Sequence, residues 1–182
     1  DAMTGWAAAQ GTGASALAVL VQGQSPKREL LRQFEAAGLP GARGAVLVAS
    51  ASFWEGVDLP GDVLQLVVID KLPFPPPDDP LVQARVQRAQ ARGEDGFAVV
   101  HLAEAALALA QGAGRLIRTE ADRGVVVLAD SRVLQRSYGP LLLAAMPPMR
   151  WLSDESGLLA ELELLAGERG VTTPSTTGFP GF

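Results

Sequence analysis

The chain has 182 residues, of which 48% are hydrophobic and 19% are charged, and this composition excludes a disordered chain. No uninterrupted apolar run reaches the roughly 18 residues of a membrane span, and the N-terminus lacks the basic and apolar segments of a signal peptide. We therefore expect a cytoplasmic protein with no membrane segment. The absence of cysteine excludes disulfides and thiolate metal sites, and the net charge of −5 opposes autonomous binding to nucleic acid.

The N-terminal third predicts a β-α-β unit after an irregular lead-in at residues 1–16, which are rich in glycine and alanine and show no periodicity. A strand, a helix and a strand are then expected at residues 17–21, 26–37 and 45–49. Ser25 is the expected N-cap of the helix, with Pro26 at its first position. Three such elements within about 30 residues are typical of a parallel pair joined by a crossover helix.

The middle of the chain predicts a buried strand, a rigid connector and a helix. The apolar run at residues 64–69 is typical of a parallel strand covered on both faces. Five prolines between residues 72 and 80 favour a rigid connector. In the helix predicted at residues 79–92, one face carries three arginines, which we interpret as a solvated surface: Arg85, Arg88 and Arg92.

The stretch QGAGRLIR, residues 111–118, lies between a helix predicted from Phe97 and a buried strand predicted at residues 124–130. Arg115 and Arg118 are three residues apart and share one side of a helical turn, and the preceding glycines allow a backbone or a phosphate to come close. The pattern indicates anion recognition. The alternative is that both arginines form surface ion pairs, with Glu120 and Asp122.

A helix interrupted at Gly139 and Pro140 is predicted at residues 131–145, and a final helix at 154–166. The tail at residues 167–182 is rich in Gly, Thr and Pro, and we expect it to be flexible. Residues 17–166 are therefore predicted to form one α/β domain, a mostly parallel sheet with helices on both faces.

Three stretches, SFWEGVDLPG at residues 52–61, KLPFPPPDDP at 71–80 and QGAGRLIR, occur in this order. In order and separation they resemble the second motor lobe of DinG/XPD-like superfamily 2 DNA helicases, across residues 21–138. The first stretch resembles motif V and the last resembles motif VI. The resemblance implies a RecA-like lobe that acts on ATP together with a first lobe, because this chain has no G-x-x-x-x-G-K-[ST] phosphate loop.

By resemblance, Arg118 is the arginine finger, Arg115 contacts the γ-phosphate, and Gln111 positions the phosphate or the attacking water. Arginine suits this role because its planar donor set is always charged. ATP and Mg²⁺ would be shared with the first lobe, and no metal would be held by this chain. Gly56 and Gly114 would allow close approach at the cleft.

Within motif V, Asp58 would bind the nucleotide sugar or tie the loop to motif VI, and Glu55 would couple the loop to Arg115 or Arg118. Single-stranded DNA is the implied second partner. Its expected contacts are Ser52, Trp54 and Lys71. For the aromatic pair of motif V, Phe53 and Trp54, base stacking and lobe packing both remain open. The rival functions are a related RNA helicase lobe and a non-catalytic α/β interaction module.

Overall fold

The computed structural model describes residues 17–39, 41–54, 59, 63–116, 123–152 and 154–168, without the side chains of Ser52, Trp54 and Glu168. The lead-in at 1–16 and nearly all of the tail lie outside these residues. The strands are β1 (Ala18–Val21), β2 (Ala45–Val48), β3 (Leu66–Ile69) and β4 (Val125–Leu128). The helices are α2 (Lys27–Ala37), α3 (Pro80–Gln90), α4 (Ala103–Gly114), α5 (Arg132–Gln135), α6 (Gly139–Ala145) and α7 (Glu155–Glu168), with a 3-10 turn η1 (Ala51–Trp54) and a π-helix η3 (Phe97–Leu102).

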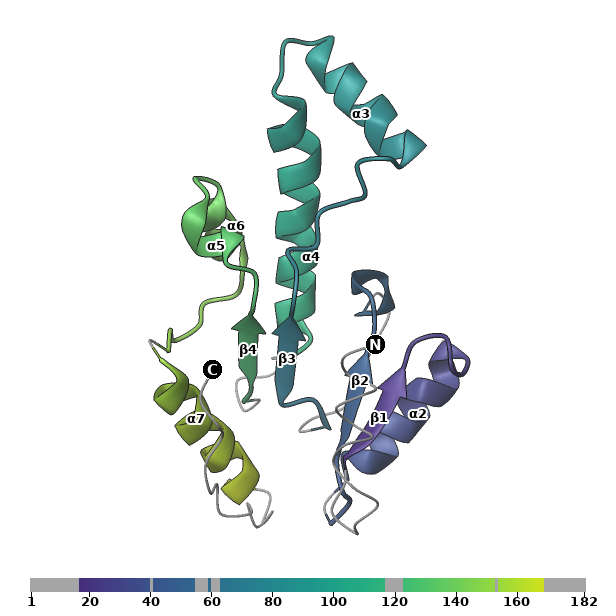
Figure 1. The fold of residues 1–182 in the computed structure, drawn as a ribbon, viewed down its shortest axis with the longest axis vertical. Coiled ribbons are helices and arrows are strands. Elements are labelled where there is room, and N and C mark those ends of the chain that lie inside the picture. The colour runs from purple at the N-terminus through teal and green to yellow at the C-terminus, as the bar shows by residue number, and fades with distance from the viewer. Residues whose placement is uncertain are drawn as a thin grey trace.

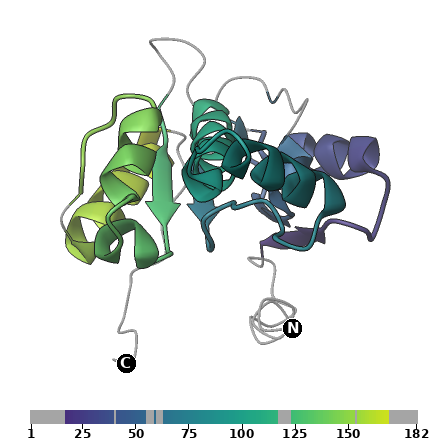
Figure 2. The ribbon, with the colours of Figure 1, turned by 90° about the horizontal axis from the view of Figure 1, so that it is seen from above.

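The four strands form two parallel pairs. β1 pairs with β2 from Ala18 opposite Ala45, and β3 pairs with β4 from Leu66 opposite Val125. Helices pack against both pairs, so the predicted α/β class is confirmed. Figures 1 and 2 both show α4 lying between the β1, β2 and α2 unit on one side and α5, α6 and α7 on the other.

The first helix, α2, covers the β1 and β2 pair with Leu30 and Phe34, whose side chains are buried. The predicted cap is wrong by one residue. Pro26 is the N-cap with an extended ψ of 144°, and no side chain caps the helix. The carbonyl of Pro26 instead accepts hydrogen bonds from the backbone N–H groups of Glu29 and Leu30, at 2.9 and 3.1 Å. Pro26 therefore starts the helix through its carbonyl group and lies just outside it.

The strand β3 is buried on one face, whereas the sequence predicts burial on both. Val67 and Ile69 are buried in a core cluster that includes Ala105 and Leu109 of α4. Leu66 and Val68, which point to the other face, are 40% and 57% exposed. The prediction was wrong because a continuous apolar run carries no alternation that would distinguish one covered face from two.

The run Phe97–Gly114 is the one helix among the described residues that is long and apolar enough to cross a membrane by length and composition. It is also the central packing helix: Ala105, Leu109 and Ala113 are 0% exposed. Glu104 on its outer side forms an ion pair with Arg85 of α3. The apolar residues of this run therefore serve the protein core, and its length and composition are weak grounds for a membrane span.

The helix α3 projects beyond the strands at the far end of α4 (Figure 1). Its N-cap is Asp79, whose side chain accepts hydrogen bonds from the N–H groups of Leu81 and Val82 at 2.7 and 3.2 Å. Its two arginines, Arg85 and Arg88, are exposed, and so is Arg92, which the structure places in the turn after the helix and not within it. Close packing onto η3 depends on Gly96, because a Cβ atom there would lie 2.8 Å from Cγ1 of Val86.

Candidate nucleotide interface

The motif VI stretch begins in the last turn of α4. Gln111 is exposed in that turn, and the helix ends at Gly114, where a Cβ atom would meet nothing within 4 Å. Arg115 is the C-cap, and its backbone N–H donates to the carbonyl of Gly112 at 3.3 Å. Its side chain is half-buried. The structure therefore places Gln111 in the last turn of α4 and Arg115 directly after the end of that helix.

The two ends of the motif VI loop are held together by packing. Leu116 is 3% exposed, and a Cβ atom on Gly124 would lie 2.3 Å from its Cδ2 atom. Only glycine fits at position 124 while Leu116 occupies this site. The N–H of Val125 then donates to the carbonyl of Gln65 at 2.8 Å and starts β4. Arg118 lies outside the described residues, between two ends that the structure fixes.

The motif V stretch begins at the carboxyl end of β2, where Gln22 holds the chain in place. The Oε1 atom of Gln22 accepts hydrogen bonds from the backbone N–H and the hydroxyl of Ser50, at 2.8 and 3.0 Å. Phe53 follows in η1 and is 6% exposed, with the Nζ atom of Lys27 5.0 Å from its ring centroid. Phe53 therefore packs inside the lobe. The side chains of Ser52 and Trp54 remain undescribed, so their predicted DNA contacts stay predictions.

The turn that opens motif V lies next to the helix that ends in motif VI, because η1 contacts α4. These two elements are about 50 residues apart in sequence, and the fold brings the turn that contains Ser52 and Trp54 against the helix that contains Gln111 and Gly114. Three further predicted site residues, Glu55, Gly56 and Asp58, lie outside the described residues. Their roles stay predictions.

The KLPF stretch is tied to the end of β4 by Asp130, a residue that the sequence analysis did not select. Its carboxylate accepts the N–H of Leu72 at 2.9 Å and the Nε and Nη2 groups of Arg132 at 2.9 and 2.5 Å. The hydrogen bonds from Arg132, followed by that from Leu72, hold the pKa of Asp130 well below its usual range despite its burial. Lys71, just before Leu72, is exposed.

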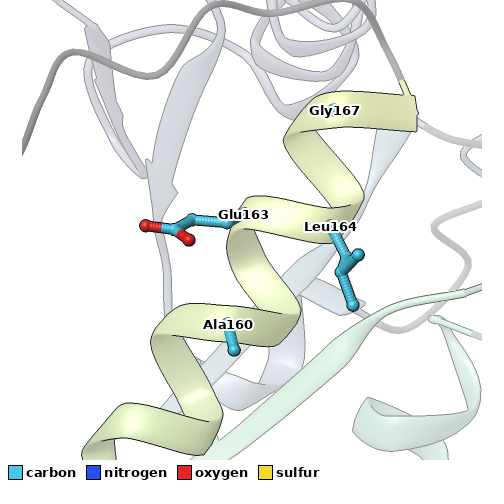
Figure 3. Close-up of a pocket in the computed structure, with 4 residues that line it drawn as sticks. All are labelled: Ala160, Glu163, Leu164 and Gly167. Carbon is cyan, nitrogen blue, oxygen red and sulfur yellow. The ribbon is translucent and has the colours of Figure 1, made fainter.

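The hollow beside α7 is not a candidate active site. Its lining residues, Ala160, Glu163, Leu164 and Gly167, all come from that one helix, and Figure 3 shows Glu163 and Leu164 pointing to different sides of it. Within the described part of the chain, no three His, Asp or Glu side chains are grouped so as to hold a metal ion. Of the predicted site residues that the structure describes, Ser52 and Trp54 lie in η1 and Gln111 and Gly114 in α4, two elements in contact, whereas Lys71 follows β3.

Parallel strand pairs flanked by helices, with the turn that opens the motif V stretch in contact with the helix that ends in the motif VI stretch, are the arrangement that the resemblance to a second helicase motor lobe implies. The chain belongs to the family described as the helicase C-terminal domain, whose model matches residues 3–149. It is 53% identical over 132 residues to the ATP-dependent DNA helicase YoaA of Escherichia coli (strain K12), covering 72% of this chain and 20% of that protein.

Two DinG proteins are also similar. The ATP-dependent helicase DinG of Mycobacterium tuberculosis (strain ATCC 25618 / H37Rv) is 44% identical over 148 residues, covering 81% of this chain and 22% of that protein. The 3'-5' exonuclease DinG of Bacillus subtilis (strain 168) is 40% identical over 136 residues, covering 75% of this chain and 14% of that protein. The chain therefore spans about a fifth or less of the length of these relatives.

Proposed function

We propose that this chain is the second motor lobe of an ATP-dependent DNA helicase and supplies arginines to ATP bound at a first lobe of the same protein. The contact between η1 and α4 carries the proposal, because it joins motif V to the helix that ends in motif VI. The similarity to the ATP-dependent DNA helicase YoaA supports ATP and DNA as the ligands, and the similarity to the ATP-dependent helicase DinG supports ATP. Residues 17–166 would form the lobe, between the lead-in and the tail.

Arg118 would be the arginine finger, and Arg115 would contact the same γ-phosphate. Gln111, exposed one turn before Arg115, would position the phosphate or the attacking water. The open space at Gly114 supports this assignment, since no atom lies within 4 Å of where its Cβ would be. ATP supplies the bond that is cleaved; this chain supplies fixed positive charge where negative charge grows in the transition state.

The DNA side of the proposal includes Ser52, Trp54 and Lys71, with Lys71 exposed at the carboxyl end of β3. Ligands of parallel α/β sheets generally bind at the carboxyl ends of the strands, which supports this placement. Glu55, Gly56 and Asp58 would couple this edge to the nucleotide. Mg²⁺ would be held by carboxylates of the first lobe, and a helicase of this kind would work in the cytoplasm.

The experiment compares ATP hydrolysis by the purified 182-residue chain and by the full-length protein, each with and without single-stranded DNA. We expect DNA-stimulated hydrolysis by the full-length protein only, because the chain has no phosphate-binding loop of its own. Hydrolysis by the 182-residue chain that disappears in its Arg118→Ala variant would contradict the proposal, since the chain would then hold a complete site.

A further inference from the structure

Four rings from three separate parts of the chain meet at the end of α4 that lies away from Arg115. We define the aromatic cluster as Phe74, Phe97, His101 and Tyr138. The ring centroid of Phe97 lies 5.8 Å from that of Phe74, 5.9 Å from that of His101 and 5.7 Å from that of Tyr138. Phe74 and Tyr138 meet edge to face at 5.6 Å. Phe97 is therefore the ring that all the others contact.

The aromatic cluster is not a buried core. Phe97 is 44% exposed, and the other three rings are half-buried. Phe74 and Tyr138 pack against the core cluster of β3 and α4. They therefore lie between this core and Phe97. An exposed phenyl ring that contacts three other rings has a fixed orientation. Its side chain therefore loses little conformational entropy when a planar ligand stacks on it.

The backbone that presents Phe97 and His101 is unusual. Both residues lie in the π-helix η3, and their rings are stacked with an interplanar angle of 23°. Short π-helical segments are rare and occur frequently at functional sites. The wider turn places two rings side by side at the protein surface, an arrangement with room for a flat ligand over Phe97.

One cation, Arg132, contacts the aromatic cluster. The guanidinium carbon of Arg132 lies 5.6 Å from the ring centroid of Phe74, and this side chain is 42% exposed. Its hydrogen bonds to Asp130 fix its direction. Lys71 and Arg136, which lie close in sequence to Phe74 and Tyr138, are exposed. Aromatic rings combined with nearby cations are the chemistry that binds single strands, because bases stack on rings and phosphates bind cations.

We infer that the aromatic cluster is a stacking site for unpaired bases of single-stranded DNA, with Phe97 as the contact ring. The inference deepens the proposed function and rests on it. The helical run from Phe97 to Gly114 separates this site from Arg115 by roughly 25 Å at about 1.5 Å per residue. Base stacking and nucleotide contact can therefore be altered independently.

The first experiment uses the full-length protein and two oligonucleotides of equal length. One carries 2-aminopurine, whose fluorescence is quenched by stacking, and the other is abasic over the bound stretch. We expect quenching upon binding, and binding of the abasic strand about 5- to 100-fold weaker, because each stacked base adds appreciable affinity. Equal affinity for both strands would overturn the inference, since it would show that only the backbone is bound.

The second experiment compares Phe97→Leu, which keeps apolar bulk without a ring, with Phe97→Tyr, which keeps the ring. We expect the leucine variant to bind the normal strand about 5- to 100-fold more weakly with little loss for the abasic strand, and the tyrosine variant to bind as the wild type does. Val99→Ala is the matched control, since Val99 is 47% exposed in the same π-helix. Normal binding by Phe97→Leu would overturn the inference.

The two proposals fail in different ways. A full-length protein with DNA-stimulated ATP hydrolysis and no difference between normal and abasic strands would overturn the stacking site and leave the motor function intact. Quenching that depends on Phe97 in a protein without ATP hydrolysis would support the stacking site and contradict the motor function. Tighter binding of a single-stranded RNA of the same sequence would overturn the choice of DNA.

Discussion

Asp130 shows how a single carboxylate positions a loop. It follows β4 in the chain, yet it accepts the N–H of Leu72 in the connector after β3 and fixes Arg132 beside Phe74. Its side chain is only 9% exposed. One residue therefore links the ends of two neighbouring strands and the underside of the aromatic cluster.

We expect Asp130→Asn to lower the free energy of unfolding by about 1 to 3 kcal/mol at pH 7, because hydrogen bonds to a charged group are lost. Since the folded state lowers the pKa of Asp130 from its ordinary 3.8, its stabilisation is full above that value and is lost as the pH falls below it. Urea unfolding at pH 7 and at about pH 3 measures this. The control is the exposed Asp70→Asn, and a difference from wild type that grows towards low pH would contradict the account.

The corner between α5 and α6 depends on a glycine in the same way that the motif VI loop depends on Gly124. A Cβ atom on Gly139 would lie 1.8 Å from the carbonyl oxygen of Val133, a backbone atom that cannot rotate away. Gly139 and Leu142 are buried there against the core beside α4. The two short helices therefore pack at an angle that only glycine permits.

Gly139→Ala is expected to lower the free energy of unfolding by about 1 to 3 kcal/mol, the usual cost of forcing extra volume into a packed site. Gly167→Ala is the matched control, because a Cβ there meets nothing within 4 Å and alanine favours a helix. Thermal unfolding of both variants measures the effect. Equal melting temperatures for Gly139→Ala and the wild type would show that the corner rearranges freely.

Elements marked by local patterns could be predicted from the sequence. The four described strands are apolar runs, and α2, α3 and α4 lie within helices that the sequence predicts. The π-helix η3 was missed because nothing in its local composition distinguishes it from an α-helix. The exposed face of β3 was missed because burial depends on which other elements cover a strand.

Some residues of the candidate site could likewise be predicted from the sequence, and others could not. Gln111 and Arg115 could be selected from a short stretch of sequence, although the structure places the first four residues of that stretch inside α4 and not after the helix. The aromatic cluster and Asp130 could not, because they join parts of the chain that are far apart in sequence, as in the contact between Asp130 and Leu72, which are 58 residues apart. Only the folded chain brings such residues together.

At the scale of the whole molecule, the net charge of −5 must be reconciled with DNA as a ligand. Affinity for DNA rests largely on phosphates neutralised by Lys and Arg. A lobe with a net negative charge can therefore offer only local contacts, such as Arg132 at the aromatic cluster and the exposed Lys71. The remaining phosphate contacts would come from the first lobe, which agrees with a DNA path shared between two lobes.

The central claim is that Arg118 acts on ATP bound at another lobe, and ATP turnover by the full-length Arg118→Ala protein tests it most directly. We expect turnover to fall by about 10³- to 10⁵-fold, or roughly 4 to 7 kcal/mol, as for other arginine fingers. Arg118→Lys should recover little, because a lysine lacks the planar donor set.

Exposed Arg88→Ala on α3 is the matched control and should keep wild-type turnover. The melting temperature of the Arg118→Ala protein should also match the wild type, since a residue that acts on ATP and not on the fold should change stability by no more than about 0.5 kcal/mol. A large loss of turnover at an unchanged melting temperature is the result we predict. Unchanged turnover, or a large drop in melting temperature, would show that Arg118 has a structural role and would contradict the account.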